Sequence, residues 1–271
     1  MKVPKAGAVA AVIGLSLTAS GCFGGGDDDK GTLSIGIKFD QPGVGMRETD
    51  GTFTGFDVDV ATYVAKELGY KPERIEFKRV DSSDRELLLQ YGEVKFVAAS
   101  YSINDKRKEK VSFAGPYFLA HQDLLVRADD PTITKAEDLN TKKLCSVTGS
   151  TSAENVKNKL APKASLLELL GYSECLVALQ DGLVDAMTTD NSILAGYAAR
   201  KGNQGKFKLV GLSLSNENYG IGVKKGDTAL QGKINTALKK MVEDGSWDTA
   251  VKKNFGENYK SEPAPPITSG S

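Results

Sequence analysis

The stretch "SYSINDKRKEK", residues 100–110, places three lysines and one arginine in its last six positions. It continues an apolar run, "KFVAAS", that is typical of a β-strand. Three interpretations fit such a cluster: a solvated face, a nucleic-acid patch, or an anion receptor in which one residue matters. An arginine suits the third, because its planar guanidinium makes two parallel charge-assisted hydrogen bonds to a carboxylate.

Two other stretches carry residue types that bind charged groups. "GSTS", residues 149–152, enters a predicted helix, and helix N-termini present free backbone N–H groups to anions. Asp190, in "TTDNS", can pair with an ammonium group, can cap the helix predicted for "NSILAGYAAR", or can do both.

Composition limits the classes of function. The chain of 271 residues is long enough for one large or two modest domains. Its 35 positive and 35 negative side chains balance, so no global field favours nucleic acid. The sole histidine, His121, makes a metal site unexpected, and we find no Ser-His-Asp set or phosphate-binding loop. We expect no cofactor.

The N-terminus has the basic, apolar and small-residue order of a secretory signal, which we assign to residues 1–21. Cys22 follows "TASG" as in a lipoprotein lipobox, although Ala19 stands where leucine is usual. The alternative is a plain signal peptide with an incidental cysteine. We favour lipid attachment at Cys22, because residues 22–31 are Gly- and Asp-rich like a flexible tether.

The two remaining cysteines, Cys145 and Cys175, lie thirty residues apart, which excludes a CxxC motif. In an exported protein such a pair favours a disulfide, and the alternative is two buried free thiols.

Strand-like and helical patterns alternate in two series. The first runs from "LSIGIK" to "KFVAAS", and the second from "KLCSVTG" to "FKLVG". Such units predict a mostly parallel sheet with helices on both faces. Extended segments at 122–130 and 218–225 link the series, which predicts two lobes, a hinge and a cleft where strand ends converge.

Five segments together resemble the polar-amino-acid solute-binding proteins (family 3) of ABC importers, and among these the glutamate-type lipoproteins of actinobacteria. The segments are "IGIKFDQPG", "GTFTGFDVDVATYVAKELG", "SINDKRKEKVSFAGPYF", "LCSVTGSTS" and "GLVDAMTTDNSILAGYA". The resemblance implies an α/β, two-lobe periplasmic-binding-protein-like (flytrap) fold of type II with two hinge strands. It places lobe 1 at 32–125 plus 220–260 and lobe 2 at 126–219, followed by a disordered tail at 261–271.

The resemblance also implies ligand-binding roles. Arg107 matches the arginine that takes the α-carboxylate, helped by Ser102 and by Ser150 and Thr151 at a helix start. Asp190 and the Ser100 carbonyl match the ammonium site. Lys38 and Arg85 stand where relatives with acidic ligands place side-chain cations.

A charge count over Lys38, Arg85 and Arg107 against Asp190 favours an acidic ligand, because unpaired desolvated charge is costly. We therefore expect a non-enzymatic, monomeric, lipid-anchored protein on the outer face of the cytoplasmic membrane. It would bind glutamate or aspartate, with glutamine or asparagine as alternatives, and deliver it to an ABC permease. Competing functions are an amino-acid sensing module and a periplasmic dehydratase of the same fold.

Overall fold

A computed structural model describes residues 1–2, 31–257 and 259–268; Cys22 and most of the predicted signal peptide and tether lie outside them. The helices are α1 (Phe56–Glu67), η1 (Pro72–Arg74), α2 (Arg85–Tyr91), α3 (Asp105–Lys108), η2 (Ala136–Thr141), α4 (Thr151–Asn155), η3 (Val156–Leu160), α5 (Tyr172–Gln180), α6 (Asn191–Ala199), α7 (Thr228–Glu243) and α8 (Ser246–Phe255). The strands are β1 (Leu33–Ile37), β2 (Asp40–Gln41), β3 (Gly45–Arg47), β4 (Phe53–Thr54), β5 (Ile75–Arg79), β6 (Phe96–Ala98), β7 (Val111–Arg127), β8 (Lys143–Val147), β9 (Ser165–Leu169), β10 (Ala186–Asp190), β11 (Phe207–Leu209) and β12 (Asn216–Lys224).

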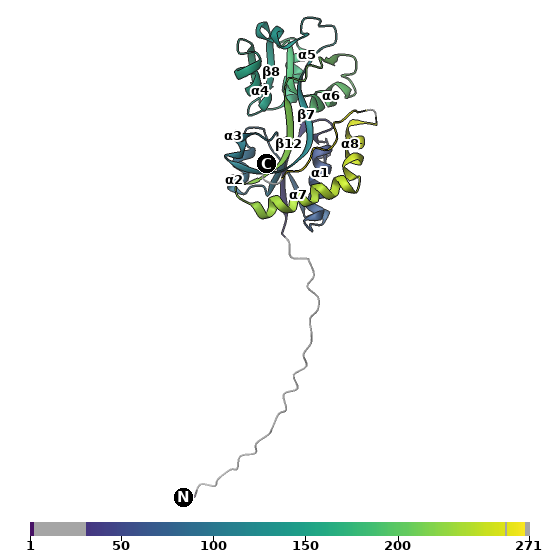
Figure 1. Cartoon of the computed structure of the whole chain (residues 1–271). Helices are drawn as coiled ribbons and strands as arrows, with labels where there is room; N and C mark the ends of the chain where they lie inside the picture. The colour runs from purple at the N-terminus through teal and green to yellow at the C-terminus, as the bar shows by residue number, and fades with distance from the viewer. Residues whose placement is uncertain (3–30, 258, 269–271) are drawn as a thin grey trace. The chain divides into compact units, whose positions relative to one another are not determined.

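The first lobe has a five-stranded layer between helices (Figure 1). β1 pairs in parallel with β5 and β6, and the layer continues through the antiparallel strands β12 and β7. α1, α7 and α8 cover one face of the sheet and share one buried apolar cluster. α2 covers the other face, over a second cluster. The sheet is therefore mixed, whereas the sequence predicted mostly parallel strands.

The second lobe repeats this plan. β10 pairs in parallel with β8, β8 pairs in parallel with β9, and β7 joins them antiparallel to β10 and β11. Leu124 and Leu125, neighbours on β7, point to opposite faces and enter two separate apolar clusters. α5 and α6 contribute to the cluster around Leu125.

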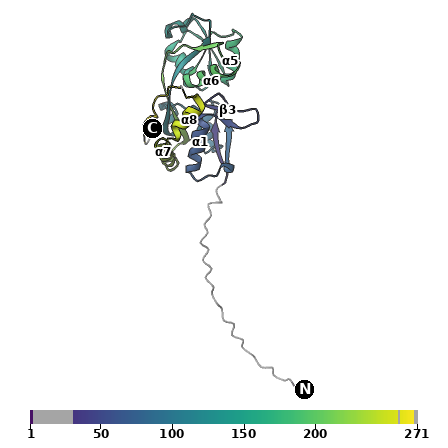
Figure 2. The ribbon, with the colours of Figure 1, turned by 90° about the vertical axis from the view of Figure 1, so that its right-hand side faces the viewer.

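β7 and β12 connect the lobes (Figures 1 and 2). β7 is one strand of 17 residues, which begins well before the predicted link at 122–130, and its residues are buried or half-buried. It pairs with β12 as far as His121 and with β10 from Gln122 onward. The two predicted hinge strands are thus β7, which pairs with strands of both lobes, and β12, which pairs with β7 and β6.

A loop of the first lobe also reaches the second. Val44, between β2 and β3, packs in the apolar cluster of α5 and α6. Asp40 accepts hydrogen bonds at Oδ2 from the backbone N–H of Ser173, at 3.2 Å, and at its carbonyl from the Tyr197 hydroxyl. This loop therefore connects the lobes a second time, through non-covalent contacts rather than through a covalent crossing of the chain.

The C-terminal segment packs on the first lobe as far as it is described. Ala264 and Ile267 lie against the cluster of α1, α7 and α8, and the Thr268 N–H donates to the Gly115 carbonyl. These contacts were not expected from the Pro- and Ser-rich composition of the tail. Residues 269–271 lie outside the described part.

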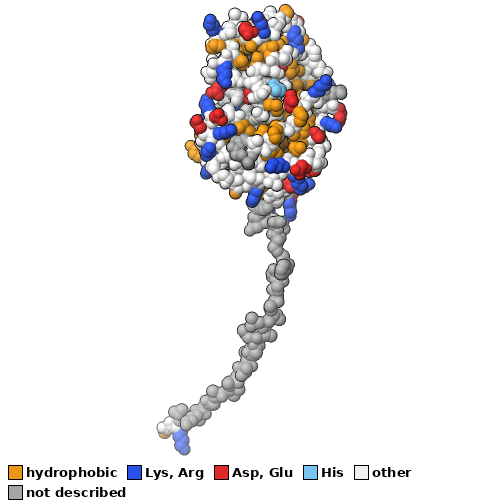
Figure 3. Space-filling model, in the orientation of Figure 1, with side chains coloured by type: hydrophobic (Ala, Val, Ile, Leu, Met, Phe, Trp, Pro, Cys, Tyr) orange, Lys and Arg blue, Asp and Glu red, His pale blue; other side chains and the backbone are white. Residues whose placement is uncertain are grey.

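The distribution of charged side chains on the surface agrees with the balanced charge of the composition. Figure 3 shows basic and acidic side chains interspersed over the face in view. Within the described ranges, helices fall short of the length and apolarity that a membrane span requires.

The predicted disulfide is confirmed, since Cys145 of β8 and Cys175 of α5 are bonded and fully buried. We expect the Cys145→Ala, Cys175→Ala double variant to lose about 2–4 kcal/mol in free energy of unfolding, because its unfolded chain regains freedom. Denaturant titration measures this loss, and wild type with reductant should match the variant. Equal midpoints for the oxidised wild type and the variant would contradict the prediction.

Candidate ligand-binding site

Strand ends from both lobes bring the predicted residues together. In the first lobe Lys38 follows β1 and Ser100 follows β6. In the second lobe Ser150 follows β8 and Asp190 ends β10. Carboxyl ends of neighbouring parallel strands meet at one sheet edge, so each lobe presents its polar residues at the edge that faces the other lobe.

A small cavity lies where these edges meet. Six of the eight predicted residues line it: Arg85, Ser100, Arg107, Ser150, Thr151 and Asp190. Lys38 and Ser102 do not line it but contact residues that do. The lining also includes Ser82, Ser152, Tyr172 and Ile193, which the sequence reasoning did not single out.

Arg107 stands apart from the other basic residues of its stretch. Its side chain is 8% exposed, against 68% for Lys106 and 39% for Lys108. Its Nη1 donates to the Ser102 carbonyl at 2.7 Å and its Nη2 to the Gly149 carbonyl at 3.0 Å. The basic cluster is therefore largely a solvated face with one arginine directed into the cleft.

Asp190 supplies a carboxyl group to the same cavity. Its Oδ2 accepts from the Tyr219 hydroxyl at 2.5 Å, while Oδ1 is buried and has no hydrogen-bond partner among the described residues. Burial, and next the nearby Glu217 carboxylate, raise the pKa of Asp190 to about 8. An unpaired buried carboxylate oxygen calls for a donor, which an ammonium group provides.

Arg85 and Lys38 are fully buried cations. Arg85 donates to the carbonyls of Ala99 and Ser100, and Lys38 donates from Nζ to the Ser82 hydroxyl at 2.8 Å. No ion pair to either side chain occurs within the described ranges. Burial, and then repulsion from Arg85, lower the pKa of Lys38 to about 7. Both cations are placed to gain from an added carboxylate.

The charge count made from the sequence was incomplete. Asp57 and Glu217 are also buried beside the site, and Glu86 Oε1 lies 3.8 Å from Arg107 Nε. These carboxylates offset part of the positive charge. The case for an acidic ligand therefore rests on the two cations without a carboxylate partner, rather than on the sum.

The four hydroxyl residues have distinct local roles. Ser150 caps α4 through a bond from the Ala153 N–H to its Oγ, and Thr151 donates to Glu217 Oε2 at 2.8 Å. Ser100 has a positive φ of 42°, and the Ser102 carbonyl accepts from Arg107. Ser102 therefore supports the site through Arg107 rather than by lining the cavity.

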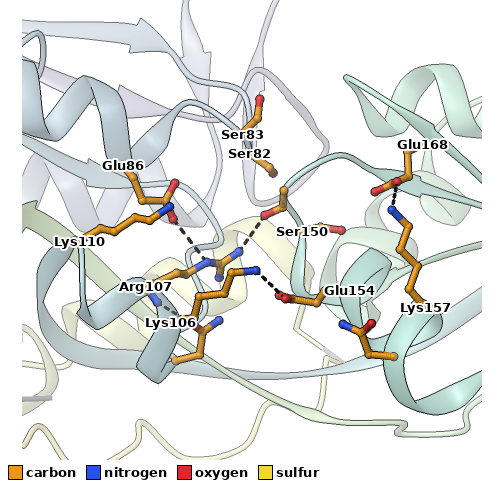
Figure 4. A pocket seen from close by; sticks show the side chains of 13 residues that line it. Ser82, Ser83, Glu86, Lys106, Arg107, Lys110, Ser150, Glu154, Lys157 and Glu168 are labelled. Carbon is orange, nitrogen blue, oxygen red and sulfur yellow. Dashed lines mark hydrogen bonds and ion pairs between the residues drawn. The ribbon is translucent and has the colours of Figure 1, made fainter.

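A larger pocket shares Ser82, Arg107 and Ser150 with the small cavity (Figure 4). Lys106 and Glu154 point toward each other across it and form an ion pair of 2.6 Å between α3 and α4. Both side chains are exposed, so this bridge contributes little to stability. Within the described residues, His, Cys, Asp and Glu side chains form no group able to hold a metal ion.

Comparison with known proteins gives the family. The model of the bacterial extracellular solute-binding proteins, family 3, matches residues 33–257. The chain is 45% identical to the glutamate-binding protein GluB of Corynebacterium efficiens, covering 95% of this chain and 92% of that protein. It is 40% identical to the ABC transporter glutamine-binding protein GlnH of Bacillus subtilis, covering 86% of this chain and 83% of that protein.

Solved structures agree in fold. An ancestral arginine-binding protein bound to glutamine superimposes with a TM-score of 0.78 at 39% identity, covering 84% of this chain and 99% of that chain. A receptor for L-cysteine of Neisseria gonorrhoeae gives a TM-score of 0.78 at 29% identity, covering 84% and 93%. The predicted two-lobe α/β fold is confirmed.

Proposed function

The chain belongs to the bacterial extracellular solute-binding proteins, family 3, a non-enzymatic binding family, and we propose that it captures an acidic amino acid for an ABC importer. One observation carries the proposal: Arg107 and the unpaired Oδ1 of Asp190 border the same cavity. A guanidinium and a carboxyl group on one small cavity can pair with the carboxylate and the ammonium group of an amino acid zwitterion.

In this proposal each lobe takes a share of the ligand. The Arg107 guanidinium binds the α-carboxylate, with Ser150 and Thr151 beside it. Asp190 and the Ser100 carbonyl bind the ammonium group. Because the first lobe holds Arg107 and the second holds Asp190, a bound amino acid bridges the lobes and stabilises their contact.

Arg85 and Lys38 are proposed to select the side chain. A carboxylate on the ligand would gain a charged partner at Arg85 and would favour the protonated form of Lys38. Glutamate and aspartate bring such a group, whereas lysine and arginine would add a like charge. The names of the two glutamate-binding Corynebacterium relatives support this choice.

The setting of the protein follows from the same proposal. We infer lipid attachment at Cys22, a tether at 22–31, and lobes at 32–125 plus 220–260 and at 126–219. The loaded monomer would dock on a membrane permease, and ATP hydrolysis would occur in a separate subunit. Palmitate labelling that is lost in Cys22→Ala would test the anchor.

A thermal-shift panel of the twenty amino acids tests the ligand class, since a ligand that binds the folded state raises the melting temperature. We expect glutamate or aspartate to give the largest shift. Lysine, arginine or a sugar as the best ligand would refute the proposal. Glutamine as the best ligand would keep the zwitterion site and refute the acidic side-chain preference.

The pKa of Asp190 predicts a pH-dependent affinity. Its carboxyl has a pKa of about 8 before an ammonium group arrives, and ion pairing lowers this pKa. Binding therefore releases a proton from Asp190, and this group alone would make the affinity for glutamate rise from about pH 6 to pH 8 and then level off. Lys38 acts in the opposite direction, because a bound carboxylate raises its pKa from about 7.

Calorimetry of wild type and Asp190→Asn separates these two effects. The variant should bind more weakly and should lose the component of affinity that rises with pH. Titrations in buffers of different ionisation enthalpy count the protons released. The same proton count for both proteins would contradict the role of Asp190.

A further inference from the structure

Asp57 is a buried acid to which the proposed binding mode assigns no role. It is the second residue of α1 and is 0% exposed. Its Oδ2 accepts from the Ser100 N–H at 2.7 Å, and its Oδ1 accepts from the Tyr117 hydroxyl at 2.6 Å. It does not line the cavity, so its two bonded oxygens serve the protein and not the ligand.

Ser100 has a backbone conformation that serine rarely adopts. Its φ of 42° lies in the left-handed region, which among the described non-glycine residues only Ser213 shares. That region is costly for any residue with a Cβ, so surrounding contacts must hold Ser100 in it. The conformation matters to the site, because Ser100 lines the cavity and its carbonyl accepts from Arg85 Nη1 at 3.3 Å.

We propose that Asp57 is a positioning residue of the binding site, which holds Ser100 in its left-handed conformation and so presents the Ser100 carbonyl to the ligand. The inference rests on the proposed function, since it assigns that carbonyl to an amino acid's ammonium group. Within the described part of the chain, Asp57 Oδ2 is the one acceptor for the Ser100 N–H, while the Ser100 hydroxyl donates separately to Gln41 Oε1 at 3.0 Å.

The first test asks whether a glycine at position 100 compensates for loss of Asp57. Glycine adopts a positive φ without an energetic penalty, whereas alanine adopts it only at a cost. In the Asp57→Ala background we expect Ser100→Gly to bind glutamate about tenfold more tightly than Ser100→Ala. In the wild-type background the two substitutions should differ by less than about threefold, because Asp57 supplies the restraint.

Matched controls separate positioning from simple loss of stability. Asp57→Asn keeps an acceptor for the Ser100 N–H and should retain affinity within about threefold, whereas Asp57→Ala should lose about tenfold. Tyr117→Phe removes the other bond to the same carboxylate and should leave affinity within about twofold. Where Asp57→Ala does not fold, Asp57→Ser takes its place. Equal effects of Ser100→Gly and Ser100→Ala in both backgrounds would overturn the proposal.

A second readout needs no ligand, so it stands even if the proposed function fails. Amide hydrogen exchange should show the Ser100 N–H protected in wild type and in Tyr117→Phe. In Asp57→Ala it should exchange at least about tenfold faster, while the strand residues Val97 and Ala98 keep their protection. Unchanged protection of Ser100 would refute the positioning role. Absence of amino acid binding by wild type would instead refute the proposed function.

Discussion

Replacing Arg107 by alanine should weaken glutamate binding at least about 100-fold, which corresponds to about 2.7 kcal/mol. Hydrogen bonds to a charged group contribute about 1.5–3 kcal/mol each, and the substitution removes a guanidinium that can make two. It also leaves the ligand's carboxylate desolvated with no cationic partner in its place. Isothermal titration with glutamate measures the loss, and circular dichroism checks that the variant is folded.

Lys108→Ala is the matched control for this prediction. Lys108 belongs to the same short helix and carries the same charge, but its side chain is partly exposed and pairs with Asp105 at 3.7 Å. We expect its affinity for glutamate to stay within about twofold of wild type, because exposed ion pairs contribute little. An equal loss in both variants would show that general positive charge, and not the Arg107 fork, binds the ligand.

The contrast between these two residues shows how much of the site the sequence could predict. A basic cluster after a strand end is visible in the sequence, and the resemblance singles out Arg107. The buried Arg107 side chain donates to the Gly149 carbonyl, which belongs to the other lobe, whereas the neighbouring Lys106 is exposed. Contacts between segments so far apart in the sequence are not encoded in local spacing, so the orientation needed the structure.

The acids that the sequence missed show the same limit. Asp57 and Asp59 both stand in the first turn of α1, where acidic residues are common for helix-dipole reasons alone. Positions two apart in a helix face different directions. Asp57 points inward to Ser100 and Tyr117, whereas Asp59 bonds to Lys253 on α8. Without the packing of α1, the buried charge could not be distinguished from the surface one.

The connection between the lobes was predicted in kind but not in extent. Extended segments between two α/β series indicated a hinge, and β7 and β12 provide it. The loop that carries Asp40 and Val44 into the second lobe has no sequence signal, because its function depends on what α5 and α6 present to it. The contact between this loop and α6 leads to a prediction that could not be made from the sequence alone.

Gly196→Ala should hinder contact between the lobes and weaken glutamate binding about 30-fold. Gly196 lies within α6, and a Cβ there would stand 1.9 Å from the Pro42 carbonyl oxygen of the first lobe. Such an approach is impossible without displacing a backbone segment. The helix itself accepts alanine and gains about 0.5–1 kcal/mol, so the second lobe should fold normally. The lobes would then adopt less often the arrangement in which Arg107 and Asp190 line the same cavity.

Gly232→Ala provides the matched control, because Gly232 also lies within a helix, α7, but a Cβ there has no neighbour within 4 Å. This variant should keep wild-type affinity and melt at a slightly higher temperature. Small-angle X-ray scattering with saturating glutamate gives an independent measure. Gly196→Ala should remain more extended than Gly232→Ala, since α6 cannot approach the loop at Pro42. If both variants bound glutamate equally and scattered alike, the contact between α6 and this loop would play no part in ligand capture.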